Sequence, residues 1–204
     1  MGTHAFELEK YRKTRKALKK LMDKERYQHT IGVSYTSACL AMCYDVDFET
    51  AYLAGLLHDC AKYLTDEEKL AMAEKAGLPI ADCERKSPGL LHAALGAYLA
   101  ETVYGVTDPE ILSAIRLHTI GKPEMTMLEK IVFVADYIEP NRPNFPMFKE
   151  IRHEAFHDID KAVYMAAKRS MDYLIEKGTH VLDPRSMDTI DYYGELVKKK
   201  EGSL

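Results

Sequence analysis

The chain has few of the features that identify membrane and secreted proteins. No apolar run in its 204 residues approaches the roughly 20 residues that a membrane span requires. The first seven residues, MGTHAFE, lead into a charged segment rather than into the apolar core of a signal peptide. The sequence therefore predicts a cytoplasmic protein without a membrane partner.

Cysteine motifs and glycine-rich phosphate loops are also missing. The four cysteines, Cys39, Cys43, Cys60 and Cys83, form no Cys-x-x-Cys pair, which argues against a zinc ribbon or a disulfide framework. Cys39 and Cys43 are four residues apart in an apolar stretch, so we expect buried, reduced thiols. Without a glycine-rich loop, a phosphate group would have to be held by metal ions and cationic side chains.

The chain carries no excess of positive charge. Its formal charge is -4, which argues against general nucleic-acid binding, and we expect no DNA partner. Lysine and arginine do gather on one face of the first predicted helix, where a solvated surface is the preferred interpretation and contact with RNA or an acidic surface is the alternative. With 47% hydrophobic residues, the chain can form one substantial core, and its length favours one domain.

No segment shows the alternation of a β-strand, and no internal repeat or low-complexity segment is present, so we predict an all-α fold. Asp47, Thr65 and Asp108 are expected to cap helices at their N-termini, and glycines such as Gly77 and Gly105 to end them. The predicted helices span about 7–24, 28–43, 47–59, 65–77, 90–103, 108–118, 127–139, 147–155, 160–176 and 185–199.

Histidine and aspartate side chains interrupt several of these helices at positions where an apolar residue is expected. Any one histidine of this kind is more often a hydrogen-bonded core residue than a ligand, but a whole set of interruptions requires a common cause. Imidazoles and carboxylates together suit iron, manganese, cobalt or zinc. The set comprises His29, His58, Asp59, His92, His118 and Asp136.

Other histidines lack this context. His157-Asp158 repeats the His-Asp dipeptide of residues 58 and 59, but no buried helix precedes it, and we interpret it as a cluster at a helix start. His4 and His153 have no supporting neighbours. Lys62, in contrast, follows His58 by four residues and would share its face on a continuing helix, which suggests a phosphate contact.

The set of six resembles the HD-domain metal-dependent phosphohydrolases. Five segments, RYQHT, LLHDCAK, HA, LHTIG and ADYIEPNR, further resemble the YqeK-type symmetrical bis(5'-nucleosyl)-tetraphosphatases, across roughly residues 26–184. Cys60 departs mildly from the pattern, in which an aliphatic residue is common. The resemblance implies a helical bundle with a metal site between its central helices, in one domain over residues 1–204. Its metal-site core would span about 26–142, and the helices of 147–199 would complete a nucleotide pocket.

The resemblance also implies an activity, the hydrolysis of diadenosine tetraphosphate into two ADP with one or two bound iron ions. Manganese, cobalt or zinc are the substitutes that the ligand types allow. The implied ligands of the first ion are His29, His58, Asp59 and Asp136, while His92 and His118 would hold a second metal or contact phosphate. Asp59 and Lys62 would be catalytic; the implied phosphate contacts are Lys62, Thr119 and Arg142, and the implied base contacts are Thr179, His180 and Leu182.

Other functions remain open at this point. One alternative is a different HD-type nucleotide phosphohydrolase, such as a nucleotidase or a (p)ppGpp hydrolase. Another is a nucleotide-binding regulator without catalysis, which the full set of ligands disfavours. The assembly state, including a homodimer, is also open.

Overall fold

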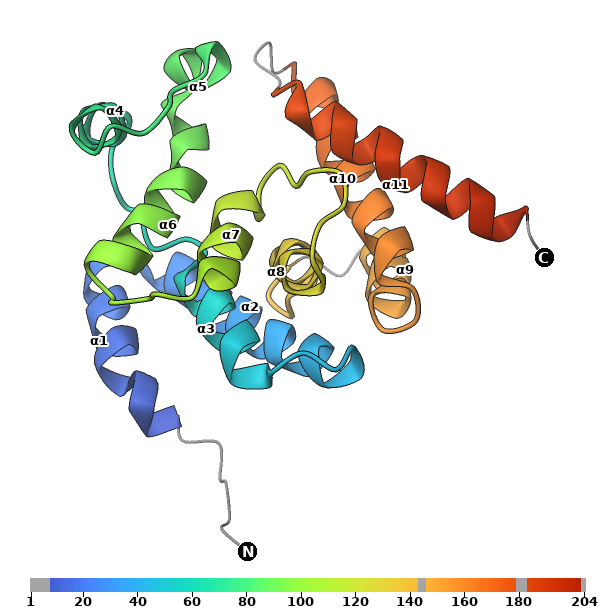
Figure 1. Ribbon diagram of the computed structural model, residues 1–204, viewed down its shortest axis with the longest axis horizontal. Helices are drawn as coiled ribbons and strands as arrows, with labels where there is room; N and C mark the ends of the chain where they lie inside the picture. Colours follow the sequence, from blue (N-terminus) through green and yellow to red (C-terminus); the bar gives the residue numbers. More distant parts are fainter. Residues whose placement is uncertain (1–7, 143–145, 179–182, 203–204) are drawn as a thin grey trace, which may run out of the picture.

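A computed structural model of the chain describes residues 8–142, 146–178 and 183–202, and every regular element within these ranges is a helix, which confirms the all-α prediction (Figure 1). Two short elements are 3₁₀ helices, η1 (Leu8–Tyr11) and η2 (Pro88–Leu91). The α-helices are α1 (Arg12–Leu21), α2 (Lys24–Cys43), α3 (Phe48–Leu57), α4 (Asp66–Lys75), α5 (Asp82–Lys86), α6 (His92–Thr102), α7 (Pro109–Leu117), α8 (Met127–Ile138), α9 (Pro146–Ala155), α10 (Ile159–Glu176) and α11 (Arg185–Glu201).

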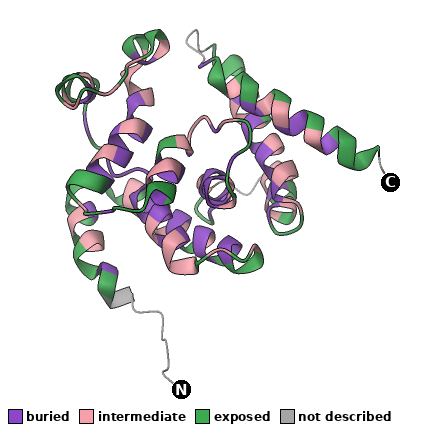
Figure 2. Ribbon diagram, in the orientation of Figure 1, coloured by how far each residue is buried: buried purple, intermediate pink, exposed green. Residues whose placement is uncertain are grey.

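Helix α8 is the centre of the arrangement. It is viewed nearly end-on in Figure 1, with α2, α3 and α7 packed on one side and α9 and α10 on the other. Helix α11 covers α10, and α4 lies against η2 and α6. The apolar run of residues 127–135 explains the position of α8, since Leu128, Ile131, Val132 and Val134 are all fully buried. Figure 2 colours the ribbon by burial.

Helices α2 and α3 approach each other closely because Gly55 has no side chain. A Cβ at Gly55 would lie 2.8 Å from Ser37 Oγ and 2.9 Å from Ser34 Cα, both on α2. Ser34 and Ser37 are fully buried in this contact. The close approach matters for function, because α3 ends just before His58 and α2 carries His29.

Several predicted helix ends are confirmed. The side chains of Asp47, Thr65 and Asp108 each accept a hydrogen bond from a backbone N–H in the first turn of α3, α4 and α7. Gly77 and Gly105 have φ angles of 66° and 72°, as expected where a helix stops. Within the described ranges, none of the helices combines the length and the hydropathy that a membrane crossing requires.

The N-terminal helix boundary was predicted wrongly. Instead of one helix over 7–24, the described part forms η1 and α1, and the chain then breaks at Met22 and Asp23. Asp23 caps α2 by accepting a hydrogen bond of 2.8 Å from Arg26 N, so α2 begins at Lys24 rather than at Gln28. The short helix α5 was not predicted at all.

The burial of Cys39 and Cys43 was also predicted wrongly, since both side chains are exposed. They lie on the solvent side of α2 together with Met42, which is 66% exposed, while Leu40 and Ala41 face the core. The buried face of α2 is instead rich in small polar residues, because these fit the close contact with α3.

Replacement of Gly55 by alanine should destabilise the fold. The added methyl group would press on backbone atoms of α2, and overpacking of this kind costs about 1–3 kcal/mol. Urea denaturation followed by circular dichroism measures the change in the free energy of unfolding. Gly89→Ala is the control, because nothing lies within 4 Å of a Cβ at Gly89. Equal stability of the two variants would contradict the packing explanation.

Candidate metal centre

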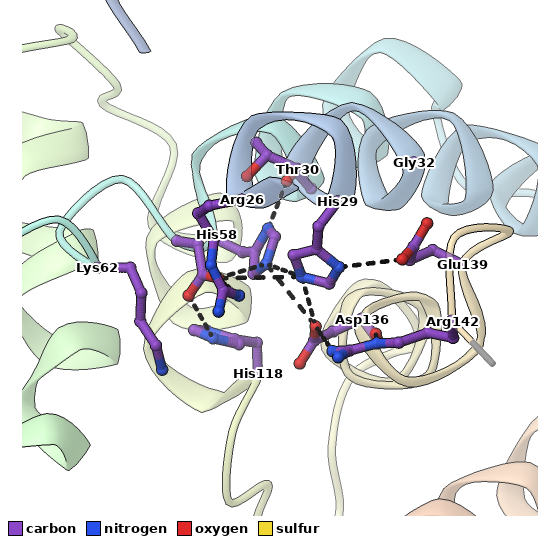
Figure 3. Close-up of polar contacts among 12 residues, drawn as sticks. Arg26, His29, Thr30, Gly32, His58, Lys62, His118, Asp136, Glu139 and Arg142 are labelled. Atoms are coloured by element: carbon purple, nitrogen blue, oxygen red, sulfur yellow. Dashed lines mark hydrogen bonds and ion pairs between the residues drawn. The ribbon is translucent and has the colours of Figure 1, made fainter. Parts of the chain in front are cut away.

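The six predicted side chains meet at one place, between α2, α3, α6, α7 and α8, and Figure 3 shows His29, His58, His118 and Asp136 of this set. Each is positioned by a helix or by a helix end. His29 lies in the second turn of α2 and Asp136 near the end of α8, His58 and His118 are the residues that follow α3 and α7, and His92 is the first residue of α6. The structure therefore brings together residues that are far apart in the sequence.

His29, His58 and Asp136 form the first group. Asp136 Oδ1 lies 3.0 Å from His29 Nε2 and 3.8 Å from His58 Nε2, and the two Nε2 atoms are 3.3 Å apart. Two nitrogen ligands that bind one ion at about 2.1 Å are themselves about 3.0–3.4 Å apart at tetrahedral to octahedral angles. The spacing of this group therefore suits a single ion.

The carboxylate of Asp59 connects the first group to a second one. Its Oδ2 lies 3.5 Å from His58 Nε2 and 3.9 Å from His29 Nε2, and its Oδ1 lies 3.5 Å from His92 Nε2 and 3.6 Å from His118 Nε2. The Nε2 atoms of His92 and His118 are 3.2 Å apart. One carboxylate thus faces two pairs of imidazoles, one pair on each oxygen.

The four imidazoles are held with Nε2 facing the centre. His58, His92 and His118 each donate from Nδ1 to the backbone carbonyl oxygen three residues earlier, at 2.6, 2.6 and 2.7 Å. These bonds place a hydrogen on Nδ1 and leave the Nε2 lone pair of a neutral ring available. Metal-ligating histidines are typically oriented in this way.

His29 differs from the other three because its Nδ1 donates to a carboxylate oxygen, Glu139 Oε1, at 3.2 Å. The second oxygen of Glu139 accepts two bonds of 2.8 Å from the backbone and the side chain of Asn141. Arg152 of α9 holds the same segment by donating to the carbonyl oxygens of Ile138 and Glu139. Glu139 is therefore fixed on both sides, and it fixes the ring of His29.

Gly32 makes room for Glu139. A Cβ at Gly32 would overlap Glu139 Oε2 and would lie 3.1 Å from Asn141 Nδ2. Since Gly32 follows His29 by three residues on α2, the absence of a side chain there lets the carboxylate reach the imidazole.

The arrangement fits a bound cation and is hard to explain without one. Asp59 is 2% exposed, and its Oδ1 has no hydrogen-bond partner among the described residues, although burying such an atom is costly. Two neutral imidazoles that point Nε2 lone pairs at each other would repel, as would two imidazolium ions, so without a cation each pair would need one protonated and one neutral ring. A divalent metal between the groups removes both conflicts.

The ionisation states of Asp59 and His92 suit metal ligands. Burial would raise the pKa of the Asp59 carboxyl, but the surrounding imidazoles of His58, His118 and His92 hold it well below its usual range. Burial, reinforced by the ammonium of Lys62, lowers the pKa of His92 to about 3, so that this ring is neutral. A carboxylate and neutral imidazoles are the forms that bind metal.

Cationic side chains border the same centre. Arg26 donates to Asp59 Oδ2 at 2.7 Å, and Arg142 donates to Asp136 Oδ1 at 2.9 Å. Lys62 Nζ lies 3.3 Å from His92 Nε2, and Thr119 Oγ1 lies 3.2 Å from the Nε2 atoms of His92 and His118. Helix α3 stops at Leu57, so Lys62 does not share a helix face with His58 as expected; a series of turns brings it to the centre.

Some residues of the site were not predicted, and some predictions lie outside the described ranges. Arg26 and Glu139 were not assigned roles; both occur within motif segments, but their partners are 33 and 110 positions away.

Thr179, His180 and Leu182 lie outside the described residues. Asp158 caps α10, which confirms its interpretation as part of a helix start.

Comparison with known proteins identifies the group to which the chain is related. The HD domain family matches residues 26–141. A symmetrical bis(5'-nucleosyl)-tetraphosphatase of Bacillus subtilis is 40% identical over 180 residues, which cover 88% of this chain and 94% of that protein. The enzyme of the same name from Staphylococcus aureus is 36% identical, over 89% of this chain and 93% of that protein.

A solved structure agrees with the sequence relatives. A crystal structure described as a predicted HD superfamily hydrolase involved in NAD metabolism, from Clostridium acetobutylicum, has a TM-score of 0.86 and 37% sequence identity. The similarity covers 91% of this chain and 97% of that one, so the helical arrangement around the centre is shared.

Replacement of Glu139 by alanine should weaken metal binding while the helices remain. Loss of a side chain that orients a ligand typically costs tenfold to a hundredfold in metal affinity. Gly32→Ala should reproduce the loss, because the added methyl group displaces the same carboxylate. Metal titration and elemental analysis measure the effect, with circular dichroism as the check on folding. Glu101→Ala, at an exposed position of α6, is the control. Wild-type metal affinity in Glu139→Ala would contradict this role.

Proposed function

The chain belongs to the HD domain family, and from this membership we propose that it is a metal-dependent hydrolase that cleaves diadenosine tetraphosphate symmetrically into two ADP. The observation that carries the proposal is the buried carboxylate of Asp59, which faces two pairs of imidazoles beside Lys62 and Arg142. Relatives that align over nearly their whole length carry the name of this activity, which supports the choice of substrate.

We assign the metal ligands from the two groups. His29, His58 and Asp136, with Asp59 Oδ2, would hold the first ion, and Asp59 Oδ1 with His92 and His118 would hold the second. Iron is the proposed native metal, with manganese, cobalt or zinc as substitutes that the same nitrogen and oxygen ligands accept. Bound metal supplies two things, a lower pKa for water and neutralisation of phosphate charge.

The protein side chains then position the reactants. Asp59 can accept a hydrogen bond from the attacking water and direct its oxygen toward one of the two central phosphorus atoms. Breaking the bond between the two central phosphates releases one ADP directly, and the water oxygen becomes part of the other. Because the cut is central, both products are ADP.

Lys62 and Arg142 can stabilise the charge that spreads over the phosphate oxygens during this step. Burial lowers the pKa of Lys62, although the Asp59 carboxylate opposes this effect. A bound phosphate would place a further negative charge beside the Lys62 ammonium and favour its charged form. Thr119 can donate its hydroxyl to the same phosphates. Thr179, His180 and Leu182 remain the proposed contacts of the base.

Two further proposals concern the number of domains and the assembly state. We propose that the chain works as a single domain, in which the helices after residue 147 complete the nucleotide pocket. A homodimer remains one of the open assemblies. We expect no DNA partner.

A panel of substrates separates this proposal from its alternatives. The iron- or manganese-loaded protein is assayed with diadenosine tetraphosphate, nucleoside monophosphates and (p)ppGpp. The proposed enzyme turns over the first of these fastest. Preference for a monophosphate or for (p)ppGpp would identify a different HD-type phosphohydrolase, and absence of turnover with metal bound would indicate a regulator.

Hydrolysis of diadenosine tetraphosphate in heavy-oxygen water should label one of the two ADP molecules per turnover. The reason is that one water oxygen enters one central phosphate, while the other ADP leaves with its original oxygens. Chromatography and mass spectrometry measure the products and the label. The appearance of ATP and AMP as primary products would show an asymmetrical cut instead.

Lys62→Met should lower kcat/KM at least tenfold without a loss of bound metal. The variant keeps an aliphatic chain but loses a charge-assisted contact worth about 1.5–3 kcal/mol, which corresponds to about tenfold to a hundredfold. Steady-state kinetics and elemental analysis measure both quantities, and Lys69→Met, at a buried lysine paired with Asp66, is the control. Wild-type kcat/KM in Lys62→Met, or a parallel loss of metal, would falsify this role.

A further inference from the structure

We propose that the cavity beside His29 and Arg142 binds the ribose and base of the second nucleoside of the dinucleotide. This inference rests on the proposed function and adds a second binding site to it. The cavity has a volume of about 510 Å³, which lies within the range of small-molecule sites. Its inner part is formed by the residues that contact the carboxylates of the metal centre, Arg26, His29 and Arg142, and Asp23, Glu25 and Gln28 from the start of α2 line its outer part.

The cavity adjoins one end of the metal centre, and two smaller cavities adjoin the other end. The smaller ones, of about 140 and 70 Å³, both contact Thr119 and share Leu90, Ile120 and Asp183. Thr119 lies against His92 and His118, whereas the large cavity contacts His29. A chain of four phosphates that crosses Asp59 would therefore place one nucleoside at each end.

The charges around the large cavity change from its inner to its outer part. Arg26 and Arg142 lie on the inner side, and although each is paired with a carboxylate, their side chains remain 34% and 36% exposed. Asp23 and Glu25 lie at the start of α2, where they would repel a phosphate but accept hydrogen bonds from ribose hydroxyls. A ligand that is anionic at its inner end and carries hydroxyls farther out matches this order.

The two ends also differ in polarity. Among the described residues, every side chain that lines the large cavity is polar or charged, whereas the opposite cavities combine apolar residues such as Leu90 and Ile120 with charged ones such as Asp183. The second base would thus be bound by hydrogen bonds, with the exposed side chain of Gln28 as the available amide. One adenosine would contact a partly apolar lining, and the other would lie in a polar site.

The test compares two ligands that differ by one nucleoside. Diadenosine tetraphosphate has both adenosines, whereas adenosine 5'-tetraphosphate has the same four phosphates and only one. The variant Glu25→Ala/Gln28→Ala should lower kcat/KM for diadenosine tetraphosphate about tenfold, mainly through KM, because it removes a charged hydrogen-bond acceptor and an amide. The inhibition constant of adenosine 5'-tetraphosphate should change less than twofold, because its adenosine would occupy the partly apolar end beside Leu90 and Ile120.

Glu67→Ala is the matched control. Glu67 has the same place in the first turn of α4 that Glu25 has in α2, so both carboxylates interact equally with a helix N-terminus. Metal content and circular dichroism should be unchanged in all variants.

Two results would overturn the inference. Unchanged kinetics in the double variant would show that the large cavity is only an opening to solvent. Equal losses for both ligands would place the effect on the phosphates instead. If the wild-type protein does not hydrolyse diadenosine tetraphosphate at all, the proposed function itself is wrong, and this outcome is distinct from the other two.

Discussion

The structure depends on one buried carboxylate that is shared by four imidazoles. Asp59 faces His29 and His58 with one oxygen and His92 and His118 with the other, at distances of 3.5–3.9 Å. Such a cluster of ligands is unfavourable in an apolar interior until a cation joins it. The surrounding helices support that cluster. Each of them either ends at the centre or runs past it, and in both cases it places a ligand there.

Backbone groups carry out much of this support. Three imidazoles are oriented by backbone carbonyl oxygens three residues earlier, in the last turn of α3 and of α7 and in η2, which leads directly into α6. Each of these bonds fixes the tautomer of its ligand. His29 lies inside a helix, where no free carbonyl is available, and Glu139 takes over this function. The difference between the four histidines therefore follows from their positions along the helices.

The sequence was sufficient to predict the cluster but not its supports. His29, His58, Asp59, His92, His118 and Asp136 could be found because each places a polar group in an otherwise buried helix. The role of Glu139 could not be predicted from spacing, because its partner is 110 positions away.

The exposed side of α2 was predicted wrongly for a different reason: Ser34 and Ser37 are buried while Met42 is exposed, so polarity does not mark the buried face. Close packing against Gly55 selects small residues there regardless of their polarity.

The distance in sequence between His29 and Glu139 has a consequence for folding. A contact across 110 positions closes a large loop, and the entropy of that closure must be met before the contact is made. The first metal group therefore becomes complete only after α2 and α8 have packed together with much of the intervening chain between them. An ion that binds only this finished arrangement stabilises the folded chain as a whole, so metal supply and the lifetime of the folded protein are coupled.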